Sequence, residues 1–240
     1  MGADLYLRVR EKEGRLYSDE VVAKLPDVSP DHPLRVEWQA RSVSAARLLK
    51  YLARLPSPLT ILELGCGNGW LSNRMAGAPD CRVMGLDWNV FELAQAARIF
   101  AGNHRLLFVH ADIFCMPIPA HSIDLVIIAS ALQYFHDAVA LIQYLSPFLT
   151  ARGEVHILDS PLYTSAELPA ARERTRLYYE RLGFPQMAAH YHHHLWDSLK
   201  PFHPIRLYDP QSWEARLRRA GGALDSPFPW LKISARAISG

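Results

Sequence analysis

The fold of this chain is decided by residues 61–70, which read Ile61-Leu62-Glu63-Leu64-Gly65-Cys66-Gly67-Asn68-Gly69-Trp70. An apolar run containing one carboxylate leads into three glycines that alternate with other residues. The apolar run predicts a short buried strand, and the glycines predict a tight turn into a helix that begins near Trp70. Glycine has no Cβ, so a flat ligand can lie against this backbone, and the helix start offers free N–H groups. The stretch therefore predicts a site for a nucleoside-like cofactor.

The spacing of the glycines separates two classes of cofactor. A dinucleotide site prefers G-x-G-x-x-G, with a pyrophosphate at the start of the helix. Here the third glycine comes one residue early, at Gly69, and the bulky Trp70 stands where that pattern has glycine. A nicotinamide-dependent oxidoreductase is therefore the weaker alternative.

Polar residues recur where the later predicted strands end. Alternation of strands and helices from Leu59 to Asp159 predicts a parallel sheet with helices on both faces, and ligands bind at the carboxyl edge of such sheets. Asp87 ends the second strand at the spacing from which a carboxylate reaches a ribose diol. The polar residues expected to share this edge are Glu63, Asp87, Asp112, Ser130 and Asp159.

This order of landmarks resembles the class I S-adenosylmethionine-dependent methyltransferases. Motif I of that family is an apolar strand, an acidic residue and G-x-G-x-G, which Glu63, Gly65, Gly67 and Gly69 match position for position. The resemblance covers roughly residues 58–160 and is closest to the small-molecule branch, which includes quinone-biosynthesis enzymes (methyltransferase type 11). It implies S-adenosylmethionine as methyl donor, S-adenosylhomocysteine as product, and an adenine site at Asp112 and Ile113. The cofactor-binding residues implied are Glu63, Gly65, Cys66, Gly67, Asn68, Gly69, Asp87, Trp88, Asp112, Ile113 and Ser130.

The sequence leaves the catalytic residue open. After the fourth strand the family has a loop shaped like L-H-H-x-x-D, but Gln133 and Tyr134 replace its two histidines here. A general base is required only if the attacking atom keeps its proton until reaction. The candidates are Tyr134, Asp159, His193 and His194.

The sequence predicts no metal centre. Adjacent histidines such as His192, His193 and His194 seldom face one ion, and no carboxylate accompanies them at helical spacing. The cysteines are odd in number and form no metal spacing, so buried, reduced thiols are expected.

We expect an α/β fold: a doubly wound, mostly parallel seven-stranded sheet with helices on both faces. Four parts are predicted along the chain: an N-terminal arm and helix (1–57), the cofactor-binding core (58–160), a helical acceptor lid inserted after strand five (161–208), and a closing helix and hairpin (209–240). In the lid, a capping box formed by Thr164 and Glu167 opens a helix that ends at Gly183. In the last part, Asp209 is expected to cap a helix, and residues 223–230 and 231–236 are expected to form the antiparallel hairpin.

The charge and the apolar content of the sequence indicate which kinds of partner to expect. The formal charge is +2 and no basic face stands out, so nucleic-acid binding is not expected. The sequence has neither an apolar stretch long enough to span a membrane nor a secretory leader, which predicts a cytoplasmic protein. The predicted function is in-line transfer of a methyl group to an oxygen, nitrogen or carbon of a small-molecule acceptor. The alternatives are a catalytically silent cofactor-binding or partner subunit and, as the weaker case, an NAD(P)-dependent oxidoreductase; the oligomeric state is left open.

Overall fold

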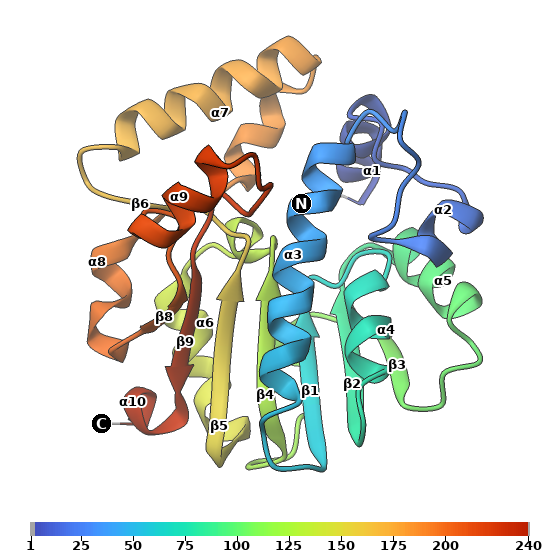
Figure 1. The fold of residues 1–240 in the computed structure, drawn as a ribbon, viewed down its shortest axis with the longest axis vertical. Helices are drawn as coiled ribbons and strands as arrows, with labels where there is room; N and C mark the ends of the chain where they lie inside the picture. Colours follow the sequence, from blue (N-terminus) through green and yellow to red (C-terminus); the bar gives the residue numbers. More distant parts are fainter. Residues whose placement is uncertain (1–2, 240) are drawn as a thin grey trace.

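A seven-stranded sheet runs through the computed structural model, which describes residues 3–239 (Figure 1). The first five strands are mutually parallel, β9 is antiparallel to β5, and β8 is antiparallel to β9. The strand order is β3 (Leu106–His110), β2 (Cys81–Asp87), β1 (Leu59–Leu64), β4 (Ile123–Ala129), β5 (Leu149–Leu158), β9 (Trp230–Ser234) and β8 (Ile205–Tyr208). The predicted sheet, with its parallel body and antiparallel end, is confirmed.

Helices cover both faces of the sheet because successive residues of each buried strand point to opposite sides. On one face, Ile61 and Leu125 pack with residues of α3 (Arg35–Leu52) and α4 (Trp70–Ala76). On the other face, Leu62 and Val126 pack with residues of α6 (Ala138–Leu145). The same second layer includes α8 (Trp196–Leu199) and α10 (Ala235–Ser239), while α5 (Val90–Ile99) runs beside β3. The predicted doubly wound arrangement is confirmed.

Two separate parts of the chain lie beyond the carboxyl ends of the parallel strands (Figure 1). One consists of α1 (Ala3–Lys12) and α2 (Asp19–Lys24). The other is the segment between β5 and β8, which contains β6 (Leu162–Tyr163), α7 (Leu168–Leu182) and β7 (His194–Leu195). Short 3-10 helices complete the fold at Ile113–Cys115, Leu132–Tyr134, Ser146–Phe148, Pro185–His190 and Lys200–Phe202.

The predicted capping box and the predicted end of α7 are confirmed, but the box closes a turn at 164–167 and the helix itself begins later, at Leu168. Thr164 N and Oγ1 donate to Glu167 Oε2 at 2.8 and 2.9 Å, and Glu167 N donates back to Thr164 Oγ1 at 3.3 Å. The helix ends where Gly183 adopts a φ of 89°, which glycine tolerates and other residues rarely do.

The closing hairpin was assigned to the wrong residues. The strand that pairs with β9 is Ile205–Tyr208, and residues 223–229 form a loop. Pro227 and Pro229 cannot donate to a strand ladder, which explains why that segment stays outside the sheet. The segment predicted as a lid (161–208) therefore overlaps the sheet, because Ile205–Tyr208 already belongs to β8.

The expected cap of the next helix was also wrong. Helix α9 (Trp213–Ala220) is capped by Ser212, whose Oγ accepts from Ala215 N at 3.3 Å. Asp209 instead holds the preceding turn by accepting from Gln211 N at 2.8 Å.

Across residues 3–239, no helix combines the length and apolar character that a membrane crossing needs.

Candidate functional site

A cavity of about 370 Å³ opens at the carboxyl edge of the sheet, within the size range of small-molecule sites, roughly 300–1,000 Å³. The strands and the loops that follow them supply one side, and the N-terminal segment with α3 supplies the other. Residues at the strand ends and in the segments that follow them line the cavity, among them Glu63, Gly65, Cys66, Gly67, Asn68, Asp87, Trp88, Glu92, Asp112, Ile113, Ser130, Tyr134, His136 and Asp159. The cavity therefore brings together almost all the residues that the sequence placed at one edge.

The glycine turn is held by the end of the neighbouring strand. Gly67 N donates to Asp87 Oδ2 at 2.7 Å, and Asn89 N donates to Asp87 Oδ1 at 2.8 Å. Gly67 has a φ of 52°, and a Cβ there would approach nothing closer than the Glu92 carboxyl oxygens at 3.7 Å. The backbone of Gly67 is thus open toward the cavity beside the Asp87 carboxylate.

Gly65 and Gly69 are required for packing. A Cβ on Gly65 would lie 2.5 Å from Ala131 Cβ, and one on Gly69 would lie 2.3 Å from Phe108 Cζ. Gly69 does not line the cavity, so the structure places this predicted cofactor-binding residue behind the turn, at the start of α4.

Three carboxyl groups surround the glycine turn: Glu63 and Glu92 are buried, and Asp87 is partly exposed at the cavity. Burial raises the pKa of Asp87, while N–H donors from Asn89 and Gly67 and the charge of Arg10 act in the opposite direction. Burial also raises the pKa of Glu92, again opposed by Arg10. Burial raises the pKa of Glu63 to about 8, although Ser72 Oγ hydrogen-bonds to this carboxyl group. Burial thus favours the neutral form of all three carboxyl groups, and the charge of Arg10 opposes this effect at Asp87 and Glu92.

Asp112 and Ile113, the predicted adenine contacts, lie in the cavity wall beyond β3. Asp112 Oδ1 accepts from Phe114 N at 3.0 Å, so this carboxylate also caps a short 3-10 helix. Trp88 lines the same part of the wall and is 60% exposed, which leaves its indole accessible.

Two residues at the ends of β4 and β5 have strained backbones. Ser130 and Asp159 are not glycines, yet they adopt φ values of 53° and 51°. Residues held in this left-handed region cluster at ligand sites, because the surrounding structure must impose the conformation. Both lie in the cavity wall, as the sequence predicted from their positions at strand ends.

Of the four catalytic candidates, Tyr134 and Asp159 line the cavity. Asp159 Oδ1 accepts from Ser44 Oγ at 2.8 Å. Burial raises the pKa of Asp159, while hydrogen bonds from Ser226 and Ser44 and the charges of two arginines oppose the rise. Tyr134 packs edge-on against Tyr6, with ring centroids 5.9 Å apart.

His193 and His194 lie outside the cavity wall. Successive residues in an extended segment point in opposite directions, and these two follow that rule. His193 Nε2 hydrogen-bonds with Thr175 Oγ1 at 2.9 Å, and His194 Nε2 hydrogen-bonds with Leu132 O at 3.0 Å. His193 therefore ties the segment after β5 to α7, and His194 ties it to the loop after β4, whereas His136 lines the cavity.

The N-terminal wall is the part of the site that sequence reasoning missed. It contributes Tyr6, Arg10, Arg15, Tyr17, Trp38, Arg41 and Ala45. An N-terminal arm and helix (1–57) was expected, but none of these residues was singled out. Residues 1–30 show no period that marks a buried face, and Trp38, Arg41 and Ala45 lie on the helix that follows. The paired charges Arg10/Glu13 and Arg15/Glu37 were the available signal, and it is a weak one because such pairs are common on surfaces.

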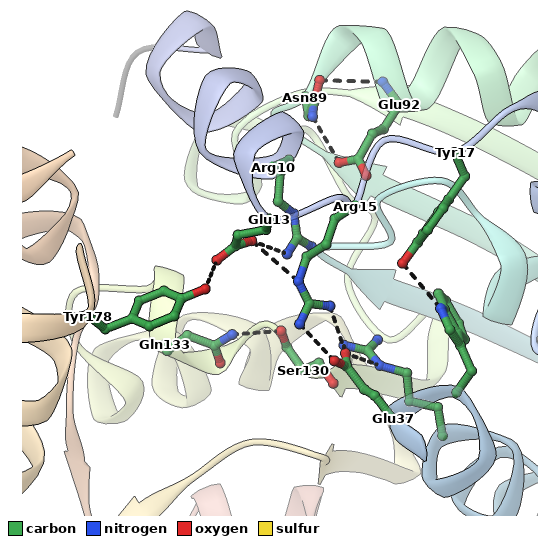
Figure 2. A network of polar contacts seen from close by, with 12 residues as sticks. Arg10, Glu13, Arg15, Tyr17, Glu37, Asn89, Glu92, Ser130, Gln133 and Tyr178 are labelled. Atoms are coloured by element: carbon green, nitrogen blue, oxygen red, sulfur yellow. Dashed lines mark hydrogen bonds and ion pairs between the residues drawn. The ribbon is translucent and has the colours of Figure 1, made fainter. Parts of the chain in front are cut away.

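A polar network ties this wall together (Figure 2). Arg15 Nη1 and Nη2 donate to the two carboxyl oxygens of Glu37 at 2.8 and 2.7 Å, and Arg41 Nε donates to Glu37 Oε1 at 3.0 Å. Glu13 pairs with Arg15 at 3.3 Å and accepts from Tyr178 Oη on α7 at 2.6 Å. The network fixes α1 between α3 and α7, above the cavity.

Comparisons with known proteins agree with this geometry. Residues 61–153 match a family model described as a methyltransferase domain. Over 120 residues the chain is 32% identical to 27-O-demethylrifamycin SV methyltransferase of Amycolatopsis mediterranei (strain S699), a match that covers 48% of this chain. This chain spans 44% of the length of that curated relative.

Solved structures share the fold at low sequence identity. The YcgJ protein of Bacillus subtilis has a TM-score of 0.58 at 14% identity, covering 80% of this chain and 96% of that chain. Geranyl diphosphate C-methyltransferase of Streptomyces coelicolor A3(2), solved with Mg²⁺, geranyl diphosphate and S-adenosylhomocysteine, has a TM-score of 0.56 at 14% identity, covering 86% and 85%. The plantazolicin methyltransferase, solved with S-adenosylhomocysteine, has a TM-score of 0.55 at 16% identity, covering 96% and 98%.

Together, the sheet order, the glycine turn and these matches show that residues 61–153 form a methyltransferase domain with the class I S-adenosylmethionine-dependent fold. The cavity fits the cofactor of this class. The open backbone at Gly67 admits a flat group, and the Asp87 carboxylate can accept from ribose hydroxyls. In the part of the chain that the structure describes, a buried guanidinium nitrogen of Arg10 has no hydrogen-bond partner. These residues would hold the cofactor.

The cysteines differ in part from expectation. Cys66 and Cys81 are buried, as expected, but Cys115 is exposed, because its short 3-10 helix lies at the surface. Among residues 3–239, no three His, Cys, Asp or Glu side chains are arranged to hold a metal ion.

Proposed function

We propose that this chain transfers the methyl group of S-adenosylmethionine to an oxygen, nitrogen or carbon atom of a small-molecule acceptor. One observation carries the proposal: a single cavity contains both the Gly67–Asp87 cradle and a second polar region at Tyr134 and Asp159. The first region suits the adenosine of the donor, and the second leaves room for an acceptor beside it.

Bound S-adenosylmethionine supplies a methyl group on a sulfonium, so the protein's task is alignment more than bond activation. Holding two reactants in line can contribute about 7–11 kcal/mol. Asp159 is our first candidate for a group that takes a proton from the acceptor, because its carboxylate faces the cavity and burial raises its pKa. Tyr134 is the second candidate.

The comparisons support a small molecule as acceptor. The curated relative is named for a rifamycin, and structural neighbours are named for geranyl diphosphate and plantazolicin. The wall opposite the strands offers Tyr17 and Trp38 as an apolar surface and Arg41 as a charge. We therefore expect an acceptor with an apolar body and at least one polar group.

The test has two stages. Calorimetry should detect binding of S-adenosylhomocysteine to the purified protein and no comparable binding of NAD or NADP. Methyl transfer from labelled S-adenosylmethionine is then measured across panels of hydroxyl, amine and activated-carbon acceptors. Absence of S-adenosylhomocysteine binding would refute the proposal. Binding without turnover on any panel would favour the catalytically silent alternative. A cytoplasmic location and the lack of a nucleic-acid partner stay predictions of the sequence.

A further inference from the structure

Arg10 is a cavity-lining cation whose hydrogen-bonding capacity is largely unused. It lies on α1, and among residues 3–239 its one hydrogen bond to another side chain runs from Nη1 to Glu13 Oε2 at a long 3.4 Å. Its Nε is buried and has no hydrogen-bond partner within the same residues. The guanidinium rests 5.1 Å from the centre of the Tyr6 ring. A buried N–H without an acceptor is costly, so this group is arranged to meet an acceptor that a ligand brings.

The other two arginines of the wall differ from Arg10 in this respect. Arg15 uses both terminal nitrogens on Glu37 and its Nε on Glu13. Arg41 is held by Glu37 through Nε and Nη2, at 3.0 and 2.9 Å. Three guanidinium groups thus share two carboxylates, and Arg10 is the one left with the weakest pairing.

The position of Arg10 points to the cofactor half of the cavity. Its charge acts on Asp87 and Glu92, which flank the glycine turn. It also acts on Tyr134, beyond the end of β4. If adenine lies at Asp112 and the ribose at Asp87, the amino-acid end of the cofactor must continue along the strand order toward β1 and β4, where Arg10 covers the turn.

We infer that Arg10 binds the α-carboxylate of the cofactor's methionine portion, an inference that rests on the proposed function. A guanidinium offers two parallel N–H donors that match a planar carboxylate. If the Arg10 guanidinium turned from Glu13 to the ligand, Glu13 would still pair with Arg15 and accept from the Tyr178 hydroxyl. The change would therefore cost little free energy in the N-terminal wall. Arg10 is therefore a cofactor-binding residue supplied from outside the 61–153 methyltransferase region.

The experiment is a binding cycle that needs no acceptor and no turnover. Calorimetry compares S-adenosylhomocysteine with its decarboxylated analogue, which keeps the adenosine, the sulfur and the amine, on the unmodified protein and on Arg10→Ala. We expect Arg10→Ala to weaken S-adenosylhomocysteine binding by about ten- to a hundredfold, the range of a charge-assisted hydrogen bond. Binding of the decarboxylated analogue should change by less than about twofold.

Two further variants sharpen the cycle. Arg8→Ala removes an exposed arginine from the same helix and should alter neither affinity. Arg10→Lys keeps the positive charge but lacks the paired N–H donors of the guanidinium. It should recover part of the S-adenosylhomocysteine affinity that Arg10→Ala loses. It also replaces Arg10→Ala in the cycle should that variant fail to fold, as judged by circular dichroism.

The outcomes separate the inference from the proposed function. Equal weakening of both ligands, or no weakening of either, would overturn the role of Arg10 while leaving methyl transfer standing. If the unmodified protein binds neither ligand, the proposed function itself fails. Selective loss of S-adenosylhomocysteine binding in Arg10→Ala supports the inference.

Discussion

Gly67 and Asp87 are joined by a 2.7 Å hydrogen bond that runs from the glycine N–H to a carboxyl oxygen across the ends of β1 and β2. This single bond both shapes the glycine turn and holds the Asp87 carboxylate at the cavity. A carboxylate oxygen has two acceptor sites, so Asp87 keeps capacity for ligand hydroxyls while it holds the turn.

Asp87→Ala should weaken S-adenosylhomocysteine binding by roughly 1.5–3 kcal/mol, about ten- to a hundredfold. The loss combines the missing contacts to hydroxyls with a looser turn at Gly67. Isothermal titration calorimetry measures the dissociation constant. Asp124→Ala is the matched control, since Asp124 also accepts a backbone N–H, that of Thr60 at 2.8 Å, but near the opposite edge of the sheet. An unchanged dissociation constant in Asp87→Ala would remove Asp87 from the site.

Substitutions at Gly67 and Gly69 should separate binding from stability. Both glycines have positive φ, so alanine costs about 1–2 kcal/mol at either position. At Gly69 the new Cβ would also collide with Phe108, which adds about 1–3 kcal/mol. Gly67→Ala meets no such clash, but its methyl group would fill the space beside the Gly67 backbone that faces the cavity.

We therefore expect urea unfolding to show the larger loss of stability in Gly69→Ala, and calorimetry to show the larger loss of cofactor affinity in Gly67→Ala. The temperature of the titration is chosen so that both variants are folded. The reverse ranking on either measurement would contradict the assignment of Gly67 to the cavity and Gly69 to packing.

Glu63 predicts a pH dependence of stability. Its pKa is about 8 in the folded protein against an ordinary value of 4.5, mainly because of burial. Between these values the folded protein keeps a proton that the unfolded chain releases, so this group's contribution is complete below about pH 4.5 and is lost as pH rises toward 8. The loss is about 1.4 kcal/mol for each pH unit.

Glu63→Gln cannot release a proton, so it should lack this slope. Urea unfolding at pH 5, 6.5 and 8 should show the variant gaining stability relative to the unmodified protein as pH rises. Glu11→Gln, at an exposed position, serves as the control for removal of a carboxylate. Parallel pH profiles for Glu63→Gln and the unmodified protein would mean that Glu63 is ionised when folded.

If Asp159 is the general base, its protonation should lower the rate of methyl transfer at acid pH. A general base must be deprotonated, so the rate falls as pH falls through its pKa, which burial raises above the ordinary 3.8. Asp159→Asn keeps the shape of the side chain and should lower kcat by about 10²–10⁴-fold and abolish that fall in rate, measured with an acceptor from the transfer panels. His193→Ala, outside the cavity wall, should keep kcat within about twofold. A full rate in Asp159→Asn would move the role to Tyr134 or to no base.

The core of the site was predictable because its signals are local. Glycines, apolar runs and strand-end carboxylates are read from short stretches, and parallel topology then brings the strand ends to one edge. Asp87, Ser130 and Asp159 reach the cavity for this reason. Asp124 lies at the other end of β4, away from the cavity, and accepts from Thr60 N and Thr150 Oγ1.

The misjudged parts depend on distant packing. Arg10 became a cavity residue only because α1 docks on α3 and α7, and nothing in its neighbourhood of the sequence encodes that docking. Strand β8 escaped prediction because an edge strand of four residues with largely exposed side chains lacks an apolar run. The fold places His193 against α7 and His194 against the loop after β4, although the sequence lists them side by side.

The two sides of the cavity carry groups of opposite charge type. Asp87 and Asp112 stand at strand ends with Glu92 of α5 beside them, whereas Arg10, Arg15 and Arg41 stand across from them and pair with Glu13 and Glu37. A molecule that bears opposite charges at its two ends would be rotated by this field before it makes contact, so its capture rate should slow as added salt shortens the reach of the field.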